Sequence, residues 1–122
     1  MKLSKSEEEL MSYLWQLGKA FMKDLLEAYP EPKPAATTVS TLLKRKQDKK
    51  YVAYKAVGNN RQYFPLVSKE IYFSKQLKGL IKNFFNDSPG QFASFFTQET
   101  DLSKKELQEL KSLIEDQLNQ KD

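Results

Sequence analysis

The chain has 122 residues, of which 39% are hydrophobic and 30% charged, and its formal net charge is +4. This balance is typical of one globular core with a modest extension and not of a disordered chain. The absence of cysteine and histidine excludes disulfide frameworks, zinc fingers and Ser-His or Cys-His nucleophile pairs. The sequence therefore favours a binding protein over an enzyme, and we expect no catalytic residues, metal or cofactor.

Positive charge is concentrated in the first part of the chain. Residues 1–70 carry 13 basic and 8 acidic side chains, whereas residues 71–122 carry 7 and 8. A polyanion would be drawn to the first part, and the nearly neutral second part suits a protein partner. Because no apolar run approaches the roughly 20 residues of a membrane span and the start lacks the apolar core of a secretory signal, we expect no membrane partner and a cytoplasmic location.

Two helices are predicted before residue 30. Ser6 and Glu9 have the spacing of a capping box, and the apolar residues after them recur at helical spacing until Gly18. Residues 23–29 predict a second, short helix, which Pro30 stops.

A third helix is predicted after the proline-rich connector 30–34. Thr37 or Thr38 is expected to cap it, and it should extend to about Lys50. Its apolar stripe consists of Val39, Leu42 and Leu43, and the polar residues that face elsewhere are Ser40, Thr41, Lys44 and Arg45.

A β-hairpin is predicted next. Residues 51–57 and 61–66 are β-prone and flank Gly58-Asn59-Asn60, a turn whose residues tolerate positive φ. Helices followed by a hairpin are the order of a winged helix, in which the hairpin is the wing. Aromatic residues of the first helix and the hairpin invite a base-stacking interpretation, but their spacing favours the core: Trp15, Tyr51, Tyr54, Tyr63 and Phe64.

The remainder of the chain predicts three more helical segments. Apolar residues recur at helical spacing from Ile71 to Phe85, and residues 86–90 break the pattern. A short helix with three phenylalanines follows, and Ser103 with Glu106 opens a last amphipathic helix.

The basic run 44–50 on and after the third helix is the strongest binding candidate. Hydroxyls near a helix start can reach base edges or phosphates, Arg can pair with guanine, and Lys attracts phosphates. The alternative is a solvated helix end whose cations complement the helix dipole. With two wing cations, the candidate contacts to double-stranded DNA are Thr37, Thr38, Ser40, Thr41, Lys44, Arg45, Lys49, Lys55 and Arg61.

Several segments resemble the penicillinase repressor family of bacterial winged-helix regulators, also called the BlaI/MecI type. Residues 8–15 (EELMSYLW) resemble its first-helix signature, and residues 37–45 (TTVSTLLKR) its recognition helix. Residues 51–52 and 63–65 fit its wing, and residues 102–110 (LSKKELQEL) its last helix.

This resemblance implies a repressor that binds a dyad operator as a homodimer. It also implies derepression through a sensor-linked protease that cuts the dimerisation region, here near Phe95 and Phe96. Three positions depart from the family pattern: Lys46 stands where leucine is usual, Lys50 where glycine is common, and Phe95 where better-known members have asparagine. A copper-responsive branch ends in clustered cysteines, so their absence here argues against copper sensing.

The back half carries the candidate dimer interface. Its phenylalanine cluster allows an intrachain core, but so small a segment has little else to cover its apolar stripes, which favours a second copy. The candidate dimerisation residues are Leu77, Ile81, Phe84, Phe85, Phe92, Phe95, Phe96, Leu107, Leu110 and Ile114.

The sequence thus predicts a mainly α protein with a small β-hairpin wing. A winged helix-turn-helix DNA-binding domain would occupy residues 1–70 and a helical dimerisation region residues 71–122. The predicted function is transcriptional repression by operator binding. The alternative is a winged-helix protein-interaction module without sequence-specific DNA binding, which the departures at Lys46 and Lys50 favour and the basic charge opposes.

Overall fold

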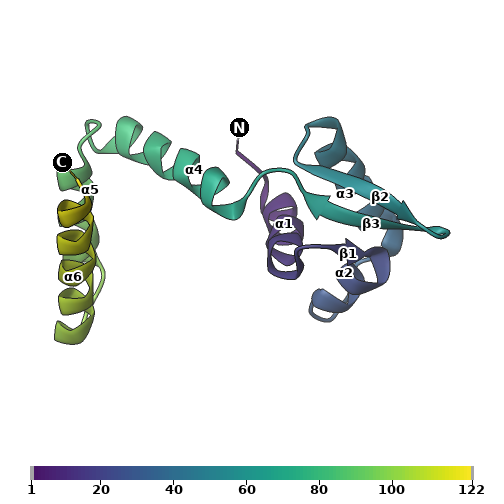
Figure 1. Cartoon of the computed structure of the whole chain (residues 1–122), viewed down its shortest axis with the longest axis horizontal. Coiled ribbons are helices and arrows are strands. Elements are labelled where there is room, and N and C mark those ends of the chain that lie inside the picture. The colour runs from purple at the N-terminus through teal and green to yellow at the C-terminus, as the bar shows by residue number, and fades with distance from the viewer. Residues whose placement is uncertain (1, 122) are drawn as a thin grey trace. The chain divides into compact units, whose positions relative to one another are not determined.

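The computed structural model describes residues 2–121, which form six helices and three strands (Figure 1). The elements are α1 (Lys5–Leu17), β1 (Ala20–Phe21), α2 (Met22–Ala28), α3 (Ala36–Asp48), β2 (Val52–Val57), β3 (Asn60–Pro65), α4 (Lys69–Phe84), α5 (Pro89–Glu99) and α6 (Lys104–Gln120). The chain forms two compact units, Met1–Leu77 and Lys78–Asp122, and α4 runs from the first into the second. The mainly helical winged-helix fold is as the sequence predicts.

Helix α1 is capped one half-turn earlier than the sequence suggests. The Ser4 Oγ accepts a hydrogen bond from the Glu7 amide (3.2 Å), and the Glu7 Oε1 accepts one from the Ser4 amide (2.9 Å). The predicted Ser6–Glu9 capping box is wrong, because Ser6 already lies in the first helical turn. At the other end Gly18 stops the helix with a positive φ of 78°, as expected of a C-cap glycine.

The first unit has one hydrophobic core. Its buried members are Leu3, Leu10, Met11, Leu14, Ala20, Leu25, Tyr29, Val39, Leu43, Val52, Tyr63 and Tyr72. Burying a large apolar side chain contributes roughly 1.5–3 kcal/mol, so this set fixes how the three front helices pack against the sheet. Trp15 lies at the edge of the core, where its indole Nε1 donates to the Val67 carbonyl (2.8 Å).

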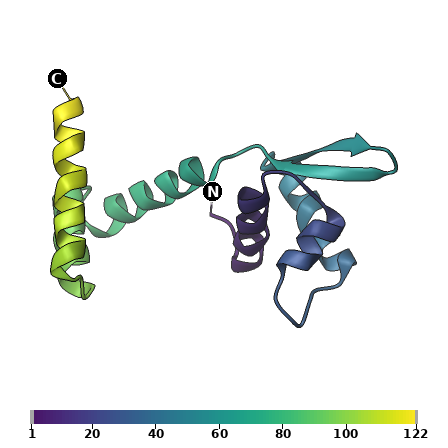
Figure 2. The same ribbon diagram turned by 60° about the horizontal axis from the view of Figure 1, so that its bottom comes forward.

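The sheet has three antiparallel strands in the order β1-β3-β2. The predicted hairpin is present as β2 and β3, and it projects beyond the helices of the first unit (Figure 2). The predicted three-residue turn is wrong at Asn60, which pairs with Val57 as the first residue of β3 and leaves Gly58-Asn59 as the turn. The strand β1 was not expected from the sequence: Ala20 pairs with Tyr63 and Phe21 with Gln62. Two residues carry no periodic signal, so only their pairing with β3 reveals this strand.

Helix α3 begins at Ala36, and its N-cap is Ala35, which provides no side-chain hydrogen bond. The predicted cap at Thr37 or Thr38 is therefore wrong, because both threonines lie inside the first turn. The helix ends at Asp48, two residues before the predicted end.

The predicted core aromatics are not all buried. Tyr63 is 5% exposed, and Trp15, Tyr51 and Phe64 are half-buried. The prediction is wrong for Tyr54, which is 40% exposed, because its strand extends past the helices that cover Val52.

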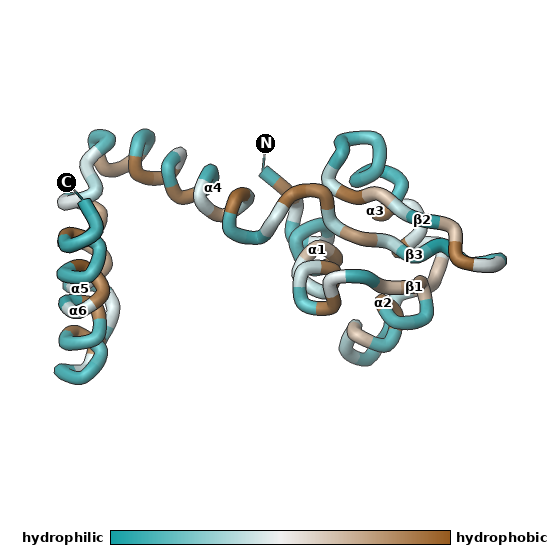
Figure 3. Tube along the Cα trace, viewed as in Figure 1, coloured by the Kyte–Doolittle hydropathy of each residue, from teal (hydrophilic) through white to brown (hydrophobic). Residues whose placement is uncertain are grey.

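Helices α5 and α6 and the last turns of α4 make up the second unit. Ser88 caps α5, and Ser103 with Glu106 forms the predicted capping box of α6. Figure 3 shows apolar residues recurring between polar ones along α6. No residue from 78 to 121 is buried, so this unit has no core of its own. None of the helices in the described residues could cross a membrane.

Candidate nucleic-acid interface

Helix α3 presents a polar face to solvent. Val39, Leu43 and Lys46 are its buried residues, and they lie on one side of the helix. The exposed side chains include all the candidate contacts on this helix, namely Thr37, Thr38, Ser40, Thr41, Lys44 and Arg45. Hydroxyls and cations that share a solvent-facing helix surface suit the edges and phosphates of a major groove.

The helical period divides this exposed surface into a central row and two flanks. Thr37, Thr41 and Lys44 form the central row, at successive spacings of four and three residues. Arg45 lies on one flank, and Ser40 lies on the other. The Thr41 Oγ1 donates to the Thr37 carbonyl (2.9 Å), which leaves its lone pairs available to accept from an external donor.

Lys46 does not belong to the binding surface, although it stands within the predicted basic run. Its side chain is 1% exposed, and its Nζ lies 2.7 Å from the Glu7 Oε2. The hydrogen bond from Lys46, aided by the Ser4 amide, lowers the pKa of Glu7 from 4.5 to about 2. The basic run 44–50 therefore does not face solvent as a whole, because Glu7 of α1 supplies a counter-charge for Lys46.

Lys49 and Lys50 follow the helix and are both exposed. Lys49 is the C-cap, and Lys50 has a φ of 64°, in the left-handed region where side chains other than glycine are strained. Glycine, common here in the family that the sequence resembles, would relieve that strain. The chain therefore reverses direction between α3 and the wing even though residue 50 is lysine and not glycine.

The two candidate wing cations lie on opposite faces of the hairpin. Lys55 pairs with Gln62, whereas Arg61 pairs with Ala56, and neighbouring residues of a strand point to opposite sides. The Arg61 guanidinium carbon lies 4.3 Å from the centroid of the exposed Tyr54 ring. This cation–π contact orders the arginine while leaving its N–H groups free to meet phosphates.

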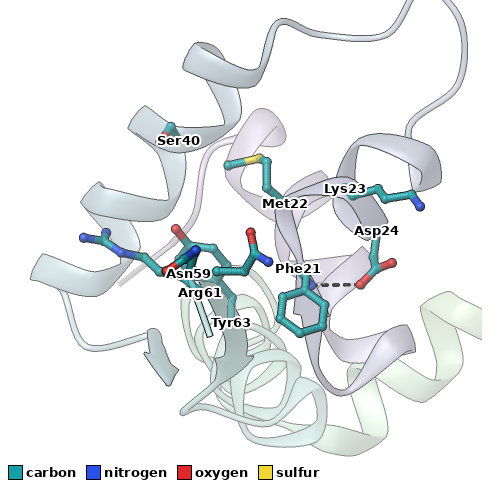
Figure 4. A pocket seen from close by; sticks show the side chains of 9 residues that line it. Phe21, Met22, Lys23, Asp24, Ser40, Asn59, Arg61 and Tyr63 are labelled. Carbon is teal, nitrogen blue, oxygen red and sulfur yellow. Dashed lines mark hydrogen bonds between the residues drawn. The ribbon is translucent and has the colours of Figure 1, made fainter. Parts of the chain in front are cut away.

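Arg61 borders a hollow between α2, α3 and the wing (Figure 4). The hollow is lined by Phe21, Met22, Lys23, Asp24, Ser40, Asn59, Asn60, Arg61 and Tyr63. It brings Ser40 of the recognition-helix candidate beside the wing and adds Lys23, an exposed cation that the sequence argument missed. A lone lysine in a short helix carries no sequence signal, and only the fold brings it near the candidate contacts. Asp24 serves as a cap, since its Oδ2 accepts from the Phe21 amide (2.9 Å).

The second unit carries an open apolar surface. On α6, Leu107 is 44% exposed and Ile114 is 60% exposed, whereas Leu110 is half-buried. Among the other candidate dimerisation residues, Leu77, Phe84, Phe95 and Phe96 are exposed, and Ile81, Phe85 and Phe92 are half-buried.

The phenylalanine cluster has contacts within the chain as well as exposed members. The ring centroids of Phe85 and Phe95 are 5.2 Å apart, and those of Phe92 and Phe96 are 6.2 Å apart. Phe84 nevertheless remains 75% exposed. The rings therefore contact one another without any of them being buried, and the cluster leaves aromatic surface uncovered.

Comparisons with known proteins identify the family. The family model of the penicillinase repressors matches residues 3–116. The chain belongs to the penicillinase repressor family. Members are DNA-binding transcriptional repressors, which are generally not enzymes.

The chain is similar to methicillin resistance regulatory protein MecI from Staphylococcus aureus (strain N315) and from Staphylococcus epidermidis. Each is 25% identical over 114 residues, which cover 93% of this chain and 93% of the relative. A solved structure with 14% identity concerns the regulation of DNA binding of Bordetella bronchiseptica BpsR by 6-hydroxynicotinic acid. Its TM-score is 0.48, with 95% of this chain and 80% of that chain covered.

Proposed function

We propose that this repressor binds a dyad operator as a homodimer, with α3 as the recognition helix. The observation that carries the proposal is the exposed hydroxyl and cation surface of α3, which stands beside a projecting hairpin. Arg45 and Lys44 would meet base edges and adjacent phosphates. The threonines, with shorter side chains, would add hydrogen bonds through their hydroxyls.

We assign a phosphate-binding role to the cations around α3. Lys23 and Arg61 border the hollow beside Ser40, whereas Lys55 lies on the other face of the wing. Cations on both faces suit a wing that meets phosphates of two strands across a minor groove. Repression would follow from occupancy of the operator, which obstructs transcription.

The second unit is the proposed dimerisation region, with residues 71–77 of α4 leading into it. Support comes from its lack of any buried residue between 78 and 121, combined with exposed Leu107 and Ile114 on one face of α6. Three helical segments without a core gain little stability alone, and a second copy would cover the apolar surface. Two copies would bring two α3 helices to successive major grooves, about 34 Å apart.

Relief by proteolysis is proposed for the same region. The bond between Phe95 and Phe96 lies inside α5, and both side chains are exposed. A sensor-linked protease would have to unwind this helix locally before cutting it. A site-specific protease sequence inserted between these residues tests the consequence: cutting should abolish operator binding, and full binding after cutting would refute the proposal.

The test of operator recognition compares Arg45→Ala with Arg45→Lys by fluorescence anisotropy. The duplexes are DNA from upstream of the protein's own gene and a shuffled control, each at several salt concentrations. A bidentate arginine contact predicts a loss of about 5- to 150-fold on the operator for either variant. Arg45→Lys keeps the charge, so its binding to shuffled DNA should be unchanged. Equal losses on both duplexes would reduce Arg45 to a phosphate contact.

Weak binding of the wild-type protein to both duplexes would count against sequence-specific recognition there. Other candidate operators would then be tried before the protein-interaction alternative was adopted.

The test of dimerisation is Ile114→Asp, with Ser112→Asp as its matched control. Both residues lie on α6 and are exposed, but by the helical period Ser112 faces away from the apolar stripe. Sedimentation at micromolar concentration should show a monomer for Ile114→Asp and a dimer for the control. A wild-type monomer would refute the mechanism.

A further inference from the structure

Lys46 is a buried cation whose charge is paired with a carboxylate inside the protein. The residue is 0% exposed, although it lies on the helix that carries the candidate DNA contacts. A buried ammonium is costly unless it is paired and hydrogen-bonded, and here Glu7 supplies the partner at 2.7 Å. Such a pair contributes little net stability compared with an apolar pair of similar shape. Its geometric role therefore needs a separate explanation.

Glu7 links the start of α1 to the end of α3. Its Oε1 accepts from the Ser4 amide, so the carboxylate is already held by the capping box. Its Oε2 meets the Lys46 Nζ. Both oxygens have defined partners, so the carboxylate has little freedom to rotate. The pair fixes the rotation of α3 about its axis at this turn, opposite the face that carries Lys44.

Lys46 also contacts Tyr51, the residue that precedes the first strand of the wing. Its carbonyl accepts from the Tyr51 amide (2.8 Å), and its Nζ lies 5.3 Å from the centroid of the Tyr51 ring. The Tyr51 carbonyl in turn accepts from the Leu66 amide (2.7 Å), just after β3 ends. The Lys46 side chain thus contacts Glu7 of α1 and the Tyr51 ring at the start of the hairpin, while backbone hydrogen bonds connect Tyr51 to α3 and to the residue after β3.

We infer that Lys46 is a positioning residue for DNA recognition, which sets the relative placement of α3 and the wing through Glu7 and Tyr51. Major-groove hydrogen bonds depend on direction, whereas phosphate attraction tolerates small displacements. Loss of the pair should therefore reduce operator binding much more than binding to random DNA. This inference rests on the proposed role of α3 as the recognition helix.

The decisive variant is Glu7→Gln/Lys46→Met. It preserves the volume of both side chains, the capping acceptor at residue 7 and the net charge of the protein, while it removes both charges of the pair. Replacing both ions by neutral groups avoids the unpaired buried charge that either single change would leave. Circular dichroism and thermal unfolding of the full chain establish that the variant folds.

We expect roughly tenfold weaker operator binding, the loss that misalignment of a base-edge contact produces. Binding to shuffled DNA should stay within about twofold, and the slope of log K against log salt should be unchanged, because no phosphate contact is lost. The control is Lys105→Met/Glu109→Gln, which removes one exposed positive charge and one exposed negative charge from the polar side of α6 and should change neither affinity.

The possible results separate this inference from the proposed function. Unchanged operator binding by the folded double variant would overturn the positioning role. A parallel loss on both duplexes, with a shallower salt slope, would also overturn it and make Lys46 a phosphate contact that becomes exposed on binding. If Arg45→Ala causes no operator-specific loss, the proposed role of α3 fails instead.

Discussion

Removal of the Glu7 charge should lower the stability of the first unit in a pH-dependent way. The substitution Glu7→Gln keeps a side-chain oxygen for the Ser4 amide but leaves the buried Lys46 ammonium without a counter-charge. The two effects of this carboxylate, capping and ion pairing, are thereby separated. In the wild type both effects lower the pKa of Glu7 and so depend on pH, whereas the neutral glutamine does not titrate.

The pKa of Glu7 supplies the magnitude. The value falls from 4.5 to about 2, chiefly because of the hydrogen bond from Lys46. That difference corresponds to about 3 kcal/mol of unfolding free energy at neutral pH. Because the pKa is depressed in the folded state, this stability is fully present above about pH 5 and is lost as the pH falls towards 2.

Urea unfolding followed by tryptophan fluorescence measures this effect. Trp15 is the single tryptophan, and its hydrogen bond to the Val67 carbonyl makes it a reporter of the first unit. At pH 7 we expect Glu7→Gln to reduce the unfolding free energy by at most about 3 kcal/mol, because the glutamine oxygen can still accept from the Ser4 amide, and the difference from wild type should shrink steadily below pH 5. Glu109→Gln, an exposed carboxylate on α6, is the matched control and should stay within about 0.5 kcal/mol.

Two results would refute this reasoning. A pH-independent difference between wild type and Glu7→Gln would mean that the variant loses packing and not the interactions of an ionised carboxylate. A difference below about 0.5 kcal/mol at pH 7 would mean that solvent stabilises both ions as well as they stabilise each other.

Three further changes test other parts of the fold by the same unfolding assay. Lys50→Gly should raise the unfolding free energy by roughly 0.5–1 kcal/mol because it relieves the left-handed φ of 64°; a loss would show that the lysine side chain compensates for its strain. Tyr72→Phe should cost about 1–2 kcal/mol, since the hydroxyl accepts from the buried Leu3 amide (2.9 Å) and donates to Glu8 (2.8 Å); no loss would show that water replaces it. Leu14→Ala should cost about 2–5 kcal/mol through a cavity in the core, and a cost below 1 kcal/mol would contradict its full burial.

The sequence determined the order and type of most elements. Helical spacing of apolar residues and the turn at Gly58 were sufficient for the helices and the hairpin, because each signal is local. The sequence also predicted which face of α3 is exposed, since the apolar residues Val39 and Leu43 lie on the opposite side.

Sequence patterns gave the wrong cap for α1, because two possible capping boxes fitted the local sequence equally well. Serine and glutamate stand three residues apart at both Ser4–Glu7 and Ser6–Glu9, and either pair could cap α1. The tertiary structure favours the first pair, because Lys46 from another helix binds Glu7 and Tyr72 from α4 holds the Leu3 amide.

Only the tertiary structure decided which cations face solvent. Lys44 and Lys46 look alike in a basic run, but the helix turns one outwards and the other towards Glu7, where a paired carboxylate permits burial. The strand register likewise separates Lys55 from Arg61, and folding brings Lys23 beside the wing. Composition and periodicity describe what each segment can form, whereas burial of a charge depends on a partner distant in the sequence.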